Sequence, residues 1–120
     1  LGLLTDTGSV TVHIARALDQ LDALILECNH DPELLACGSY PWHLKQRVGG
    51  PLGHLSNQQA ADLLTKIDTS RLQHLVAAHL SENNNRPHLV RELLSTVPVC
   101  RHAEIMVADQ PAGMPWKTLE

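Results

Sequence analysis

Short runs of apolar residues alternate along this chain with longer segments whose apolar positions recur at helical spacing. Three runs, at Leu1–Thr5, at Ala23–Cys28 and within Leu72–Asn85, each end abruptly in polar residues, and a fourth covers Ala103–Ala108. Apolar runs of this length, bounded by polar residues, are typical of buried strands in a parallel sheet. The pattern therefore predicts four strands.

The segments between these runs predict five helices. Apolar residues share one helical face through Val10–Leu21, after a turn whose last residue, Ser9, is a favourable N-cap. Asp31–Pro32 is typical of a helix start, and Ser56–Gln59 has the pattern of a capping box. The five helices are expected at Val10–Leu21, from Pro32 to near Gly38, at Pro41–Val48, from Ser56 to about Asp68, and from Arg86 to before Pro98.

The resulting order, β-α-β-α-α-α-β-α-β, predicts an α/β fold with mainly parallel strands and flanking helices. The 120 residues correspond to one domain or part of one. The chain begins at Leu1 and its first residues already have a strand pattern, which favours a piece of a longer protein. No apolar run approaches the ~18 residues that a membrane-spanning helix needs, and no signal peptide is visible.

Composition and charge narrow the function classes. The formal net charge of −4 excludes a generally basic nucleic-acid-binding coat. Between Leu34 and Ala61, however, there is no Asp or Glu, and this stretch holds His43, Lys45, Arg47 and His54. Such a strip can bind phosphates, although an ordinary solvated helix face is the alternative. Three cysteines without C-x-x-C spacing argue against a disulfide framework or a thiolate zinc site, and favour a reducing compartment such as the cytoplasm.

Residues capable of binding metal follow three of the predicted strands. Asp6 follows the first, Glu27 and His30 end the second, and His79 ends the third. In open α/β sheets, functional residues collect just beyond the carboxyl ends of the strands. We therefore expect the function of this protein where these strand ends converge.

Each of these residues also has a plain structural interpretation. Asp6 can bridge two cations through its two oxygens, or merely cap the helix that follows. His79 can ligate zinc, manganese or iron, or be a buried histidine bonded to a carbonyl. Glu27 and His54 can form a carboxylate–imidazole pair for proton transfer or ligand support, or be an edge-strand charge and a loop residue. The role of His30 stays open.

Four motifs, taken in order, resemble a known family: TDTG (Thr5–Gly8), LILECNHD (Leu24–Asp31), GHLSNQQAA (Gly53–Ala61) and LVAAHLSENN (Leu75–Asn84). The set is similar to the C-terminal half of metallo-β-lactamase-fold hydrolases. Within that superfamily it most resembles the bacterial YycJ/WalJ-like branch, and more distantly the RNase Z-type enzymes that process tRNA 3′ ends. The match spans roughly residues 1–85.

The resemblance implies a four-layer αββα sandwich with two divalent metal ions, zinc or manganese, between its sheets. Asp6 would be the bridging carboxylate and His79 the last histidine ligand of the second metal. Glu27 and His54 match motifs that assist proton transfer in the RNA-processing relatives. The substrate-binding residues would be Asn83 and Asn84, which follow the ligand, together with Lys45 and Arg47 of the acid-free strip.

The family's H-x-H-x-D-H ligand motif is absent from this sequence. The two family ligands present cannot complete a site that needs three or four protein donors per metal. We therefore expect 1–120 to be the C-terminal half of one metallo-β-lactamase-like domain, inactive alone, with the other half supplied by the same or another polypeptide.

The resemblance implies a metal-dependent phosphodiester hydrolase, a 5′→3′ exonuclease-like nuclease that uses a metal-bound hydroxide on nucleic acid. Two alternatives remain at this stage. One is a thioester or lactone hydrolase of the same fold, and the other is a non-catalytic α/β module that uses its strand ends for partner contact.

Overall fold

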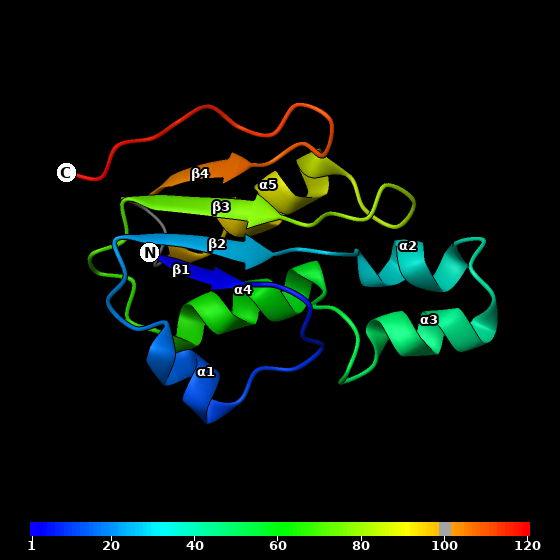
Figure 1. The fold of residues 1–120 in the computed structure, drawn as a ribbon. Helices are drawn as coiled ribbons and strands as arrows, with labels where there is room; N and C mark the ends of the chain where they lie inside the picture. Colours follow the sequence, from blue (N-terminus) through cyan, green and yellow to red (C-terminus); the bar gives the residue numbers. More distant parts are fainter. Residues whose placement is uncertain (99–101) are drawn as a thin grey trace.

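The predicted order of nine elements is confirmed by the computed structural model, which describes residues 1–98 and 102–120 (Figure 1). The elements are β1 (Gly2–Leu4), α1 (Val12–Ala17), β2 (Ala23–Glu27), α2 (Pro32–Cys37), α3 (Trp42–Gly49), α4 (Asn57–Lys66), β3 (His74–Ala78), α5 (Pro87–Ser95) and β4 (Glu104–Val107).

The four strands form one parallel sheet in the order β1-β2-β3-β4. Ile25 of β2 is the partner of Leu3 on one side and of Val76 on the other, and Val76 in turn pairs with Met106. Because all strands run the same way, their carboxyl ends lie at one edge, where α2 and α3 project beyond the sheet (Figure 1). The predicted α/β class with parallel pairing is confirmed.

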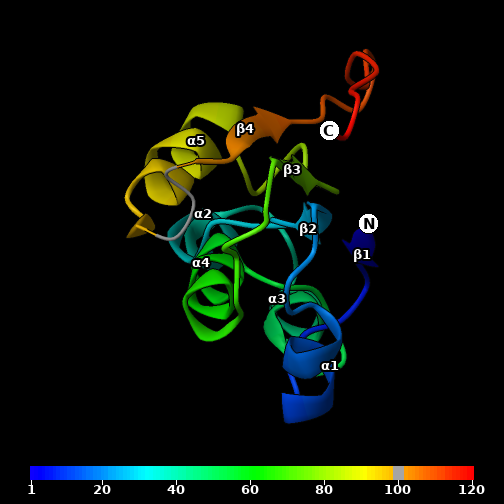
Figure 2. The same cartoon turned by 90° about the vertical axis from the view of Figure 1, so that its left-hand side faces the viewer.

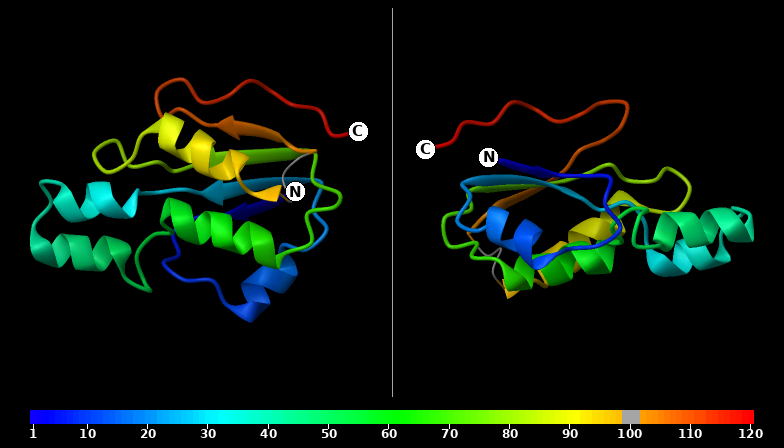
Figure 3. Two further views of the ribbon diagram at one scale, coloured as in Figure 1. Left: turned by 180° about the vertical axis from the view of Figure 1, so that it is seen from behind. Right: turned by 60° about the horizontal axis from the view of Figure 1, so that its bottom comes forward.

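Helices α1, α4 and α5 cover one face of the sheet (Figures 2 and 3). Alternate strand residues point to this face, and they pack there against leucines and valines of the helices. The resulting core includes Leu24, Leu26, Leu75 and Ala77 from the sheet, Leu63 and Leu64 from α4, and Val90 and Leu94 from α5. Since the chain has no Phe, branched aliphatic side chains fill this core, as the composition implies.

On the opposite face of the sheet no helix lies among the described residues, and the C-terminal segment runs across it (Figure 2). Gln73 exchanges two hydrogen bonds with Glu120, and the ring Nε2 of His74 lies 3.0 Å from the Thr118 carbonyl oxygen. The segment covers the face only in part, because Leu3 of β1 remains 64% exposed. The described residues therefore form one helical layer and one sheet, and the four-layer sandwich stays a prediction.

Helix α1 is shorter than predicted. It begins after Thr11, whose hydroxyl accepts a hydrogen bond from the Ile14 amide, rather than after Ser9. It ends at Ala17 because the chain leaves the helical region and Gln20 adopts a left-handed backbone (φ +57°), from which its amide donates to the Asp68 carbonyl. The other predicted caps are confirmed: Asp31 and Pro32 start α2, and the capping box of Ser56 and Gln59 starts α4.

None of the helices in the described ranges has both the length and the apolar character needed to cross a bilayer.

The two faces of the sheet should respond differently to the same truncation. Leu24→Ala removes a side chain that is 1% exposed beneath the helices and should lower the free energy of unfolding by about 2–5 kcal/mol. The matched variant Leu3→Ala lies on the open face and should change it by less than about 1 kcal/mol. Urea denaturation followed by circular dichroism measures both, and equal losses would contradict the one-sided core.

Candidate metal centre

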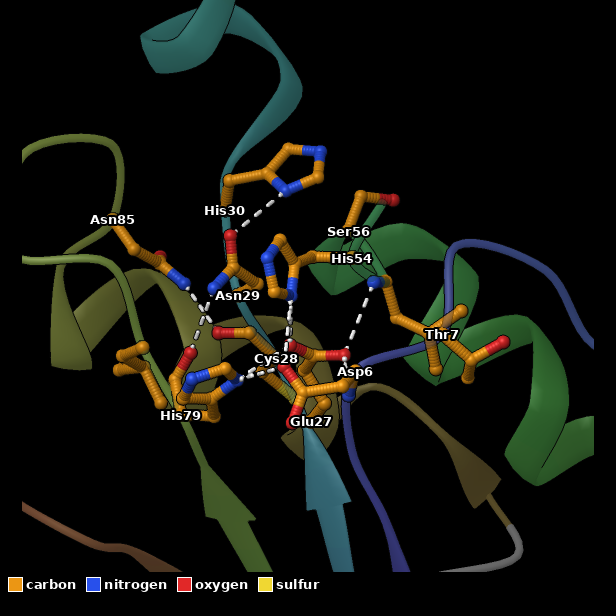
Figure 4. Close-up of polar contacts among 12 residues, drawn as sticks. Asp6, Thr7, Glu27, Cys28, Asn29, His30, His54, Ser56, His79 and Asn85 are labelled. Atoms are coloured by element: carbon orange, nitrogen blue, oxygen red, sulfur yellow. Dashed lines mark hydrogen bonds and ion pairs between the residues drawn. The ribbon is translucent and has the colours of Figure 1, made fainter. Parts of the chain in front are cut away.

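Four side chains meet at the carboxyl edge of the sheet (Figure 4). Asp6 follows β1, Glu27 is the last residue of β2, His79 directly follows β3, and His54 precedes α4. One ligand atom from each of these residues lies within 4.8 Å of the others. The structure thus brings together the four residues that the sequence named as metal ligands or as the acid–base pair.

Glu27 lies at the middle of this cluster and is fully buried. Its Oε1 is 2.8 Å from Nδ1 of His54 and 2.7 Å from Nδ1 of His79. Its Oε2 accepts hydrogen bonds from the backbone amides of Asp6, at 3.0 Å, and Leu55, at 3.4 Å. A buried carboxylate with this many donors is well satisfied, and it fixes three separate loops relative to β2.

The hydrogen bonds to Glu27 determine which ring nitrogens remain free. An ionised carboxylate only accepts hydrogen bonds, so the Nδ1 atoms of His54 and His79 are the donors. In the neutral imidazoles the lone pairs then lie on Nε2. A carboxylate that holds Nδ1–H in this way is the usual support for a histidine that binds metal through its other nitrogen.

The carboxylate oxygens of Asp6 take no part in these hydrogen bonds. Its Oδ1 lies 3.6 Å from Nδ1 of His54 and 3.8 Å from Nδ1 of His79, beyond hydrogen-bond distance, and its side chain is 68% exposed. An unbonded carboxylate and two imidazoles with free Nε2 atoms are donor types that suit Zn²⁺ or Mn²⁺. The chemistry of these residues therefore fits a divalent metal.

Two of the four residues have an unusual backbone. Asp6 and His79 adopt left-handed conformations, with φ of +59° and +58°. Such conformations in non-glycine residues are uncommon and cluster at functional sites, where surrounding contacts must hold them. Here the contacts are the bond from the Asp6 amide to Glu27 and a bond from the Asn29 side chain to the His79 carbonyl, at 3.0 Å. Both turns direct the strand ends towards the shared site.

A close approach of two loop backbones sets the position of Asp6 relative to His54. A Cβ at Gly8 would lie 2.0 Å from the Gly50 carbonyl oxygen and 2.7 Å from the Gly53 nitrogen. Glycine is required there because only it allows this contact. The GGPLG segment, too irregular for a phosphate-binding P-loop, thus serves as the surface against which the TDTG turn rests.

Sequence reasoning missed a set of structural asparagines around the site. Asn57 and Asn85 are buried and exchange amide hydrogen bonds at 2.9 and 2.8 Å, and Asn85 also donates to the Cys28 carbonyl. With Asn29 they connect the loops after β2 and β3 to the start of α4. Their only sequence signal is an excess of amides just after apolar strands.

All four predicted substrate-binding residues lie outside the cluster of metal-competent side chains. Asn83 is exposed and Asn84 is buried, in the loop that follows His79. Lys45 and Arg47 lie on α3, which projects beyond the strand ends (Figure 1). The Lys45 ammonium donates to the Ala36 carbonyl at 2.6 Å and so ties α3 to α2, whereas Arg47 is exposed.

Two further residues beside the site are not donors in it. Burial, together with the charge of Glu27, raises the pKa of the Cys28 thiol to about 12, so no thiolate is available. His30 is 3% exposed, and burial and the neighbouring His54 lower its pKa below the ordinary 6.5. Its carbonyl accepts from the Asn57 amide at 2.9 Å. His30 is therefore a buried residue beside the cluster whose backbone supports the start of α4, and its role stays a prediction.

Comparison with known proteins identifies relatives of this chain. No protein-family model matches the chain. It is 37% identical over 118 residues to exodeoxyribonuclease WalJ of Streptococcus pneumoniae, and 38% identical over 97 residues to exodeoxyribonuclease YycJ of Bacillus anthracis. The chain is similar to curated exodeoxyribonucleases. The resemblance to the YycJ/WalJ-like branch, inferred from four motifs, is supported by these relatives.

The similarity to WalJ covers 98% of this chain but only 41% of WalJ, and that to YycJ covers 81% of this chain and 37% of YycJ. The chain therefore spans well under half the length of these relatives.

The lowered pKa of His30 predicts a loss of stability in mild acid. At a pH between the lowered folded pKa of His30 and its unfolded pKa near 6.5, the unfolded chain binds more protons than the folded chain. The contribution of His30 to stability is therefore fully present above pH 6.5 and is lost as the pH falls below it. This residue adds at most about 1.4 kcal/mol per pH unit to the slope. Urea titrations from pH 8 to pH 5 should show a shallower decline for His30→Gln. A parallel decline would contradict the assignment, and the exposed His13 supplies the control variant His13→Gln.

Proposed function

We propose that this chain forms part of a metal-dependent hydrolase of nucleic-acid phosphodiesters, an enzyme of the 5′→3′ exodeoxyribonuclease kind. The observation that carries the proposal is the convergence of Asp6, Glu27, His54 and His79 within 4.8 Å. The similarity to the exodeoxyribonucleases WalJ and YycJ adds DNA as the substrate class. Carboxylate and imidazole donors at one point are the usual basis of metal-assisted hydrolysis.

Asp6 and His79 would hold the metal, with Asp6 shared between two ions, zinc or manganese. When bound, such ions activate water and neutralise charge that develops on the phosphoryl oxygens. The Nε2 lone pair of His79 and the unbonded oxygens of Asp6 are the atoms this chain offers for the purpose.

Glu27 and His54 would serve proton transfer beside the metal. Glu27 holds Nδ1–H of His54 at 2.8 Å and so fixes the ring and its tautomer. Nε2 of His54 is then the atom that can take a proton from water or return one to the leaving oxygen. The buried Glu27 acts through the imidazole, since it is fully enclosed and already accepts several hydrogen bonds.

The remaining donors would come from outside these 120 residues. Two ligands are too few for a metal that needs three or four protein donors, and WalJ is more than twice as long as the matched region. We propose that the other part of such a protein packs on the incompletely covered apolar face of the sheet, around Leu3, Ile25 and Met106, and completes an αββα sandwich. Lys45 and Arg47 would contact the DNA backbone, and the enzyme would act in the cytoplasm.

Removal of either proposed ligand should abolish most activity. In the protein at its full natural length, Asp6→Ala and His79→Ala should each lower kcat/KM for bis-p-nitrophenyl phosphate and for duplex DNA by at least about a hundredfold. Each should also reduce the metal content measured by mass spectrometry. His13→Ala, in an exposed histidine of α1, is the control. Near-normal rates with both variants would reject the assignment.

Adding the proposed missing segment tests whether this chain holds only part of the metal site. The isolated chain should bind little Zn²⁺ or Mn²⁺ and hydrolyse no phosphodiester. After it is mixed with a separately produced segment that carries H-x-H-x-D-H, the chain should bind metal and hydrolyse phosphodiesters. A thioester offered to the same mixture separates a thioesterase of this fold from a phosphodiesterase. Activity without the second segment would contradict the incomplete site, and none with it would favour a non-catalytic module.

A further inference from the structure

Helix α3 has one continuous exposed face. Successive residues of a helix are turned by about 100°, so residues that follow the pattern i, i+1, i+4, i+5 lie on the same side. In α3 these positions are all exposed, and they are Trp42, His43, Gln46 and Arg47. Because α3 projects beyond the carboxyl edge of the sheet (Figure 1), this face is accessible to a large ligand.

The surroundings of this face are positive although the chain as a whole is acidic. The chain has 13 acidic residues among its 120, but none lies between Leu34 and Ala61. Within the described residues, Arg71 and Lys117 form ion pairs with carboxylates, whereas Arg47 forms none. An exposed guanidinium without a carboxylate partner is available to a phosphate. The charge of this face therefore suits a polyanion.

Trp42 adds an aromatic surface to this charge. It is the first residue of α3 and is 72% exposed. A single exposed apolar residue is ordinary, but an exposed indole on the same face as an unpaired cation is the combination that holds single-stranded nucleic acid. There the cations follow the backbone and the aromatic ring stacks on a base. A base inside a duplex is already stacked on both sides, so Trp42 can accept only an unpaired or terminal base.

The other end of α3 adjoins the metal cluster. The Val48 carbonyl accepts a hydrogen bond from the His54 amide at 2.9 Å, and Val48 lines a cavity of about 310 Å³ that His54 and His79 also border. With a rise of 1.5 Å per residue, Arg47 and Trp42 are separated by about 7.5 Å along the helix axis. This separation matches two steps of ~3.4 Å along one DNA strand. A strand with one phosphodiester at the cluster can therefore run outward along α3.

We propose that the exposed face of α3 binds a single-stranded segment of DNA, with Arg47 on a phosphate and Trp42 stacked on a base. The inference rests on the proposed nuclease function and deepens it, because it makes an unpaired strand end the form in which DNA enters the site. Trp42 and Arg47 are positioning residues in this arrangement, since they hold the strand away from the reacting atoms.

The first experiment measures binding separately from hydrolysis. The protein at its full natural length is titrated into a fluorescent duplex whose phosphorothioate linkages resist hydrolysis and which carries an overhang of about ten thymidines. Trp42→Ala should raise the Kd obtained from fluorescence anisotropy by about tenfold, through loss of one base–aromatic stack. Trp116→Ala, in the other exposed tryptophan of the chain, is the matched control and should leave the Kd unchanged.

An abasic overhang of the same length separates stacking from charge, because it keeps the phosphates and lacks the bases. Trp42→Ala should have no effect on its binding. Arg47→Gln should weaken binding of both overhangs and should reduce the slope of log Kd against log salt concentration by about one. Arg16→Gln, in an exposed arginine of α1, is the control and should change neither quantity.

An unchanged Kd of Trp42→Ala for the thymidine overhang, or an equal loss with the abasic overhang, would overturn the proposal. A lower melting temperature with an unchanged Kd would also overturn it, and would assign Trp42 to a contact with another protein segment. The nuclease function is tested separately: an unmodified protein that binds the overhang but hydrolyses no DNA would lose that function and keep the binding face.

A second measurement locates the strand without any substitution in the protein. Thymidines of the overhang are replaced by 5-iododeoxyuridine, which forms a covalent adduct with a stacked aromatic side chain when it is irradiated. Tandem mass spectrometry of the digested protein should place an adduct on Trp42. Adducts found only on other residues would overturn the proposal.

Discussion

The carboxylate of Glu27 is the constraint on which this site depends. Its two oxygens contact both imidazoles and the backbone amides of Asp6 and Leu55, so one buried side chain joins the ends of β1 and β3 to the start of α4. Burying a charge is unfavourable unless donors surround it. The same bonds that make the burial of Glu27 tolerable therefore determine where each proposed functional group lies.

The backbone strain near Glu27 is a consequence of this arrangement. Parallel strands deliver their ends to one edge but aim alternate side chains at opposite faces. Left-handed turns at Asp6 and His79 redirect the chain so that both side chains reach the carboxylate. The contact of Gly8 with Gly50 and Gly53 and the buried pair of Asn57 and Asn85 hold the flanking loops while this happens. Rigid packing of neutral groups thus supports a strained, polar centre.

The parts of this structure that could be predicted from the sequence are those determined by local patterns. Apolar runs gave the four strands, and the caps at Asp31 and Ser56 gave helix starts, because each depends on adjacent residues. The early end of α1 could not be foreseen, since it depends on a bond between Gln20 and Asp68. The same holds for the asparagine pair, Asn57 and Asn85, whose members lie 28 residues apart. The pair of Glu27 and His54 stood beside a plain structural alternative at the sequence level, because spacing cannot show which loops meet.

The apolar face that no described helix covers (Figure 2) and the exposed carboxylate of Asp6 lie on one side of the sheet. Glu27 is two residues from Ile25 in β2, so both side chains leave the strand towards the face that the helices do not cover. The exposed carboxylate of Asp6 adjoins the same edge. One additional layer placed on that face could bury Leu3 and Ile25 and, at its margin, bring further donors to Asp6 and His79. Stability and metal affinity would then be acquired together, because the contacts that exclude water from the apolar face would also close the metal site.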